Sequence, residues 1–240
     1  MQPPCIVGDL HANGQAHAAA IRAARARVVV FPELSLTGYD LKAPLVSTGL
    51  DALGPVVAAC EGAGSVALVG APVGDSHGRH YIATLRVTAA GVDVVCRKTW
   101  LGAGESARFS PGDGPGVIDV DGWSLGLGIC KDNGTPQHRA QVASLGVDVY
   151  ATGVLHRPDQ LSMQQEWGAA MARQCSAHVV FASFAGPTGS GYAATAGSST
   201  IWSPAGTVLA QAGLEPGGIA RATIPAAAGR PSCEGGEGLV

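Results

Sequence analysis

The sequence predicts an α/β protein in which a mixed β-sheet is covered by helices. Short runs rich in Val, Ile and Leu alternate with Ala-rich stretches of helical character along the 240 residues. Two of the strand-like runs are joined by a short turn at Ala90 and Gly91, as in a hairpin. Since hairpins pair strands antiparallel and strand–helix alternation pairs them parallel, we expect mixed rather than purely parallel pairing.

The individual elements follow from the same patterns. Helices are expected where Ala-rich segments have helical periodicity, and the first of them carries Asn13 as a candidate N-cap. The helices are predicted at residues 11–27, 51–60, 136–145 and 160–176. The strands are predicted at residues 28–31, 65–73, 81–88, 92–98, 123–130, 147–151, 179–184, 198–203 and 208–212.

The chain is expected to form a single domain over residues 1–225, followed by a flexible tail over residues 226–240. The tail is rich in Ala, Gly and Glu. The first four residues, MQPP, favour a turn, although an alternating layout would place a strand before the first helix. The first strand is therefore expected to be truncated, either because an edge strand is absent or because the true start lies upstream.

Composition and charge restrict the class of function. Hydrophobic residues make up 46% of the chain and charged residues 14%, which excludes a disordered polar protein. No apolar run of about 18 residues predicts a membrane span, and the first residues lack a secretion signal. The formal net charge is −3 without a Lys/Arg cluster, so we expect no nucleic-acid partner.

The six cysteines form no C-x-x-C pair, and the two histidines of His77-Gly78-Arg79-His80 have no third ligand in evidence. We therefore expect no metal site. A chain of this size and hydrophobicity does not need disulfides, so we expect reduced thiols and a cytoplasmic protein.

Three reactive side chains each come at the carboxyl end of a predicted strand, where open α/β sheets build their sites. Glu33 follows VVVFP, Lys98 follows VVCR, and Cys130 follows LGLGI. Taken singly, each has an ordinary interpretation: an exposed loop acid, a solvated edge lysine and an inert core thiol. Lys131 beside Cys130 would favour the thiolate form of the cysteine.

Together, the three side chains form a complete hydrolytic set. A cysteine can attack a carbonyl or nitrile carbon, and a carboxylate can take the thiol proton and return it to the leaving amine. An ammonium group can stabilise the oxyanion that develops on the substrate.

The segments around these residues resemble the three signatures of the nitrilase superfamily of carbon–nitrogen hydrolases, in the family's order. They are VVFPELSLTGY (29–39), CRKTWLGAGESARFSPG (96–112) and GLGICKD (126–132), and AGSSTIWSPAGTVL (196–209) resembles a fourth family segment. The likeness covers about residues 2–224. It implies a four-layer α-β-β-α sandwich, commonly paired into homodimers through the outer helices, and a reaction without metal or organic cofactor.

The resemblance also implies roles for single residues. Glu33 matches the general base, Lys98 the lysine that stabilises the transition state, and Cys130 the nucleophile. Glu105 matches a second glutamate that positions the lysine and substrate, and the backbone N–H of Lys131 would join the oxyanion hole.

Two further residues are expected to bind substrate. Tyr39 would line the pocket entrance, and His156 lies in a loop that often shapes the pocket of this family. For His156, a surface histidine is an equal alternative.

Several positions depart from the family pattern without removing a catalytic group. Trp100 stands in place of a frequent histidine, Cys96 and Lys131 in place of frequent aromatic residues, Gln137 in place of a glutamate and Ser183 in place of an asparagine. We expect these departures to alter the pocket or the helix after the cysteine.

The expected function is hydrolysis of a small amide or carbamoyl compound through a cysteine thioester. Two alternatives stay open: a nitrilase acting on small nitriles, and a catalytically weak ligand-binding member of the fold.

Overall fold

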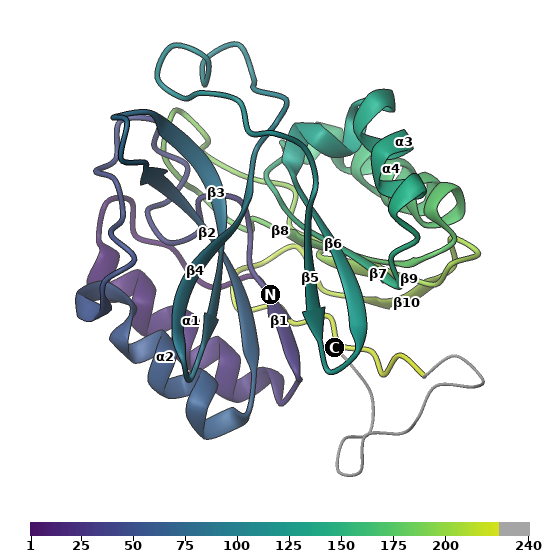
Figure 1. Ribbon diagram of the computed structural model, residues 1–240, viewed down its shortest axis with the longest axis horizontal. Coiled ribbons are helices and arrows are strands. Elements are labelled where there is room, and N and C mark those ends of the chain that lie inside the picture. Colours follow the sequence, from purple (N-terminus) through teal and green to yellow (C-terminus); the bar gives the residue numbers. More distant parts are fainter. Residues whose placement is uncertain (226–240) are drawn as a thin grey trace.

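Two β-sheets pack face to face in the computed structural model, which describes residues 1–225 (Figure 1). The first sheet has the order β1-β2-β3-β4, and the second has the order β10-β9-β8-β7-β6-β5. The strands of the first sheet are β1 (Val28–Val30), β2 (Val66–Gly74), β3 (His80–Thr88) and β4 (Gly91–Arg97). The strands of the second are β5 (Gly116–Val120), β6 (Trp123–Ile129), β7 (Val149–Val154), β8 (His178–Ser183), β9 (Thr200–Trp202) and β10 (Val208–Gln211).

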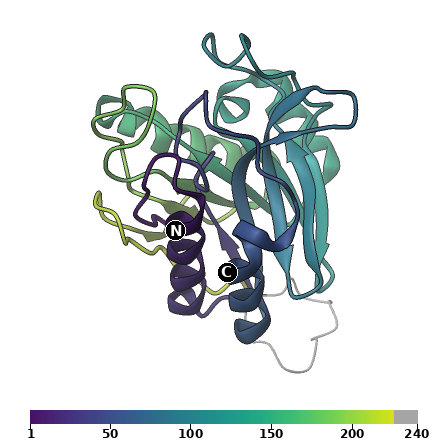
Figure 2. The ribbon, with the colours of Figure 1, turned by 90° about the vertical axis from the view of Figure 1, so that its left-hand side faces the viewer.

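Helices cover the outer face of each sheet. Helices α1 (Leu10–Ala24) and α2 (Leu50–Ala63) pack side by side on the first sheet, as Figure 2 shows from the side. Helices α3 (Pro136–Leu145) and α4 (Leu161–Cys175) cover the second sheet (Figure 1). Two short 3₁₀ turns, η1 (Cys130–Gly134) and η2 (Pro158–Gln160), complete the described elements. The expected four-layer α-β-β-α sandwich is thereby confirmed.

The valine run of β1 is buried on both faces because successive side chains point to opposite sides of a strand. Val29 belongs to the apolar core under α1 and α2, whereas Val28 and Val30 belong to the core between the two sheets. A continuous apolar run is therefore what this central position requires.

Strand pairing is mixed, as predicted. The pairs β1–β2, β6–β7 and β7–β8 are parallel, and the remaining pairs are antiparallel. Sequence patterns missed β5, whose five residues GVIDV alternate in burial and show no apolar run. The first helix ends at Ala24 rather than residue 27 because Arg25 takes a left-handed conformation with φ of 46°.

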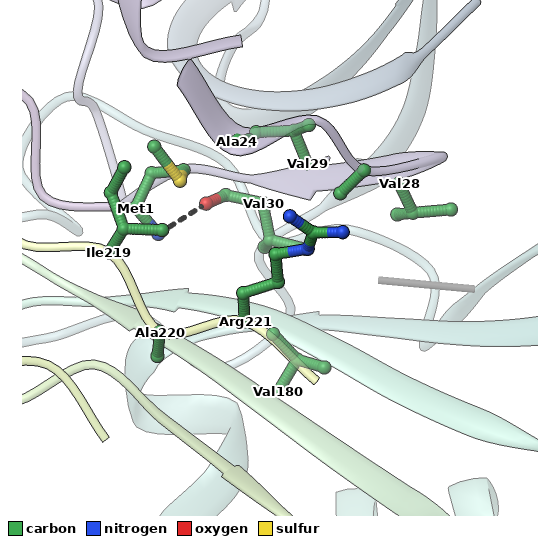
Figure 3. Close-up of a pocket in the computed structure, with 10 residues that line it drawn as sticks. Met1, Ala24, Val28, Val29, Val30, Val180, Ile219, Ala220 and Arg221 are labelled. Carbon is green, nitrogen blue, oxygen red and sulfur yellow. Dashed lines mark hydrogen bonds between the residues drawn. The ribbon is translucent and has the colours of Figure 1, made fainter. Parts of the chain in front are cut away.

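The amino end lies beside β1 rather than forming a strand of its own. The Met1 ammonium donates to the Val30 carbonyl oxygen at 3.0 Å, next to a small apolar pocket between β1 and the Ile219–Arg221 segment (Figure 3). Burial lowers the pKa of this ammonium to about 5. Within the described residues, no strand precedes α1.

The predicted cap of the first helix was wrong. Asp9 caps α1, since its carboxylate accepts from the Ala12 backbone N–H at 2.9 Å. Asn13 lies inside the helix, where its amide hydrogen-bonds the backbones of Ile6 and Leu36. A side chain that crosslinks two loops replaces the expected cap.

Among residues 1–225, none of the helices combines the length and hydrophobicity needed to cross a bilayer. The predicted tail, residues 226–240, lies outside the described residues. The five cysteines within residues 1–225 are free thiols.

Candidate active site

The structure brings three of the four predicted catalytic side chains into direct contact. Lys98 Nζ donates to Glu33 Oε1 at 2.6 Å and to Glu105 Oε1 at 2.7 Å. These three side chains are almost completely buried, with 0–2% of each exposed. Residues 65 positions apart in the chain therefore meet at the ends of β1 and β4.

Glycine contacts fix the backbone at Glu33. A Cβ atom on Gly70 would lie 2.3 Å from the Pro32 carbonyl oxygen, and one on Gly153 would lie 2.6 Å from the Glu33 backbone nitrogen. Gly70 belongs to the first sheet and Gly153 to the second. The chain at Glu33 is thus held between two backbones that approach it without intervening side chains.

Cys130 forms the turn between β6 and η1. Its backbone takes a left-handed conformation with φ of 47°, which is uncommon for a residue with a side chain. Its Sγ lies 3.5 Å from the Leu155 carbonyl oxygen, and its own carbonyl accepts from Asn133 Nδ2 at 2.8 Å. The Tyr150 hydroxyl donates to Asn133 Oδ1 at 2.8 Å, so a buried polar network supports the turn.

The charges of the cluster are balanced around Lys98. Burial by itself would lower the Lys98 pKa, but attraction to Glu33, Cys130 and Glu105 outweighs it and raises that pKa. Burial also opposes ionisation of Glu105, yet the Lys98 charge and hydrogen bonds from Lys98, Tyr39 and the Gly102 backbone lower the Glu105 pKa. Lys98 is therefore held as a cation and Glu105 as a carboxylate.

Glu33 differs from Glu105. Burial raises the pKa of Glu33 to about 7, against the attraction of Lys98, and the Glu105 charge raises it further. Glu33 Oε2 has no hydrogen-bond partner by ordinary geometry, although the Cys130 thiol lies close enough to lower the Glu33 pKa. Glu33 can therefore exchange a proton near neutral pH.

The expectation that a cation beside Cys130 would favour its thiolate was wrong. Burial first, and then the Glu33 charge, raise the pKa of the Cys130 thiol, and Lys98 only partly opposes them. The Lys131 ammonium instead donates to the Leu101 carbonyl oxygen at 2.6 Å, and its side chain is exposed. Cys130 therefore needs a base to become a nucleophile.

The two predicted pocket residues lie beside this cluster. The Tyr39 hydroxyl donates to Glu105 Oε1 at 2.6 Å. His156 is buried rather than on the surface, with Nδ1 2.9 Å from Gln164 Oε1 and its ring against Trp167. Burial lowers the pKa of His156, and the nearby Lys98 charge lowers it further.

The departures from the family pattern fall into two groups. Trp100 and Gln137 are exposed, whereas Cys96 and Ser183 are buried and hydrogen-bonded. Only Trp100 of these four is a large side chain that reaches solvent near the cluster, since it follows Lys98 by two residues.

Sequence patterns missed two residues near the cluster, Arg157 and Tyr192. The Tyr192 ring packs edge-on against Tyr39 with 5.4 Å between centroids, and the Arg157 guanidinium lies 5.8 Å from the Tyr192 centroid. Tyr192 sits in a Gly-rich loop with no periodic signal. Within residues 1–225, no group of three or more His, Cys, Asp or Glu side chains is arranged to hold a metal ion.

The chain belongs to the carbon–nitrogen hydrolase family, whose model matches residues 1–231. Curated relatives include an (R)-stereoselective amidase from a Pseudomonas species, which is 31% identical over 78% of this chain and 69% of its own. Another is a hydrolase encoded in the pqqF 5′ region of Pseudomonas protegens, which is 29% identical over 89% of this chain and 76% of its own.

Solved structures show the same fold. The amidase of the nitrilase superfamily from Nesterenkonia sp. AN1 superposes with a TM-score of 0.79, at 23% identity, covering 90% of this chain and 87% of that one. Saccharomyces cerevisiae Nit3, also of that superfamily, has a TM-score of 0.79 at 22% identity, covering 92% and 86%. The resemblance seen in the sequence is thereby confirmed at the level of family and fold.

Proposed function

We propose that this protein hydrolyses small amides through a thioester on Cys130. The observation that carries the proposal is the buried Glu33–Lys98–Glu105 cluster, whose three charges all act on the Cys130 thiol. Membership of the carbon–nitrogen hydrolase family and the relationship to amidases support it. In the Nesterenkonia amidase, acrylamide adds to an active-site cysteine, which shows that this fold can present a reactive thiol.

Glu33 acts as the general base in this mechanism. It takes the Cys130 proton as sulfur attacks the amide carbon, and it gives that proton to the leaving nitrogen. Water, deprotonated by the same carboxylate, then attacks the thioester and releases the acid. The net reaction converts an amide and one water into a carboxylic acid and ammonia, with Cys130 regenerated.

Lys98 and Glu105 prepare the site for charge. The Lys98 ammonium, together with the Lys131 backbone N–H, stabilises the oxyanion on the former carbonyl oxygen. Glu105 holds Lys98 in place through its 2.7 Å contact, and Tyr39 holds Glu105. Because two carboxylates face one ammonium, the cluster stays fixed without rearrangement during the reaction.

Ammonia release from acetamide, propionamide and butyramide tests the proposal. Cys130→Ala should lower kcat by at least about a thousandfold, while Cys96→Ala, which removes another buried thiol, should keep most of the activity. Full activity of Cys130→Ala would refute the mechanism. Small carbamoyl compounds and nitriles in the same assay decide whether either is preferred, and binding without turnover would favour a ligand-binding protein.

The homodimer and the cytoplasmic location stay predictions. Light scattering at micromolar concentration measures the first, and fractionation of cells that make the protein measures the second.

A further inference from the structure

Arg157 lies near the nucleophile on a short backbone connection. It follows Leu155 by two residues, and the Leu155 carbonyl oxygen is 3.5 Å from Cys130 Sγ. The Arg157 side chain is exposed, and it comes just before the η2 turn. A cationic group therefore stands at the solvent side of the buried cluster.

A pair of aromatic rings links Arg157 to that cluster. The guanidinium packs on Tyr192, Tyr192 packs on Tyr39, and the Tyr39 hydroxyl donates to Glu105. The pKa of the half-buried Tyr192 is raised by burial and by the Cys130 charge, and lowered by the Arg157 charge. Tyr192 is thus within electrostatic range of both Cys130 and Arg157, so Arg157 is placed where a substrate would enter.

Arg157 has no carboxylate partner among residues 1–225. Both buried glutamates of the site bind Lys98, and exposed arginines elsewhere pair with aspartates, as Arg79 does with Asp75. Asp159 is two residues away in the chain but makes no ion pair with Arg157. The planar guanidinium therefore keeps its hydrogen-bond donors available, in a position that the Tyr192 ring helps to fix.

We propose that Arg157 binds a carboxylate on the substrate, so that the preferred substrates are small amides with an anionic group at the far end. This inference rests on the proposed amide hydrolysis. A guanidinium matches a carboxylate through two parallel hydrogen bonds, which is more selective than a point charge. The buried cluster would act on the amide, and the rim would select the acid.

Matched substrate pairs test the inference. The monoamides of butanedioic, pentanedioic and hexanedioic acid each carry a terminal carboxylate, and methyl ketones of the same length replace it with a neutral group of similar shape. Ammonia release gives kcat/KM for each, and the measured quantity is the ratio of the anionic to the neutral substrate. In the unaltered protein, this ratio should be about 10–100 for at least one pair, as expected for one charge-assisted hydrogen bond.

Arg157→Met should bring that ratio close to one, mainly through a higher KM for the anionic amide, and Arg157→Lys should restore part of it. Arg22→Met removes an equal charge from the exposed face of α1 and should leave the ratio unchanged. A ratio near one in the unaltered protein, or a ratio that Arg157→Met does not change, would overturn the inference while hydrolysis of the neutral amides still upheld the proposed function. If no amide is hydrolysed, both proposals fall together.

Discussion

The Asp132 carboxylate joins the lysine segment to the nucleophile turn through the backbone of Trp100. Its Oδ1 accepts from the Trp100 N–H at 2.8 Å and its Oδ2 accepts from the Ile129 N–H at 2.9 Å. Trp100 follows Lys98 by two residues, and Ile129 precedes Cys130. One buried side chain therefore sets the position of the ammonium relative to the sulfur.

Asp132→Asn should disturb both stability and catalysis. An amide can accept only one of the two backbone N–H bonds, and its nitrogen would face the other donor, so the loss should be about 1–3 kcal/mol. Urea denaturation measures this loss, and ammonia release should show a lower kcat. Asp119→Asn is the control, because Asp119 accepts a single N–H at an exposed turn. Equal stability of the two variants would contradict this role of Asp132.

The two glutamates that bind Lys98 should respond oppositely to neutralisation. The Glu33 pKa is raised from 4.5 to about 7, so the folded state keeps a proton that the unfolded state has lost, and stability falls as pH rises through this window. The Glu105 pKa is lowered, so its contribution is present above pH 4.5 and is lost as pH falls through its folded-state pKa.

At pH 8, Glu33→Gln should therefore raise the free energy of unfolding and Glu105→Gln should lower it, each by about 1–3 kcal/mol. Both variants should lose activity, so the gain in one case is not a gain in function. Chemical denaturation at pH 8 checks the signs, and the same sign for both variants would be incompatible with the assigned charges.

The rate of hydrolysis should fall in acid with a midpoint near pH 7. Only ionised Glu33 can take the Cys130 proton, and its pKa is about 7. The profile of kcat/KM against pH measures this midpoint in the free protein. The acid limb should be absent from the residual activity of Glu33→Gln. A midpoint near 4.5 in the unaltered protein would exclude Glu33 as the titrating base.

Gly128→Ala should destabilise the support of the nucleophile turn. A Cβ atom there would lie 2.0 Å from the Tyr150 hydroxyl and 2.6 Å from His138 Nε2, which are themselves 3.1 Å apart. Overpacking of this kind typically costs about 1–3 kcal/mol. Gly62→Ala in α2 meets nothing within 4 Å and should be neutral or stabilising. Thermal unfolding of both variants distinguishes them.

The sequence predicted the fold best where periodicity is strong. The alternation of strands and helices was sufficient for the layers and for mixed pairing, but β5 was missed because GVIDV is short and half exposed. The cap at Asn13 was wrong because a local preference for capping gave way to hydrogen bonds with distant loops.

The sequence also named the residues of the cluster but not their protonation. Glu33, Lys98 and Glu105 could be named from motifs, whereas the opposite pKa shifts of the two glutamates depend on burial that only the folded chain creates. Tyr192 and Arg157 could not be found, since their proximity to Tyr39 depends on the path of a loop.

The glycines that flank Glu33 limit how such a protein can diversify. With Gly70 on one side and Gly153 on the other, main chain touches main chain, and no side chain can be trimmed to enlarge the space around Glu33. Larger or differently shaped substrates must therefore be accommodated from above, by exchanging loop residues such as Trp100 and Tyr192. Directed evolution should concentrate its libraries on these loops and leave the inter-sheet glycines untouched.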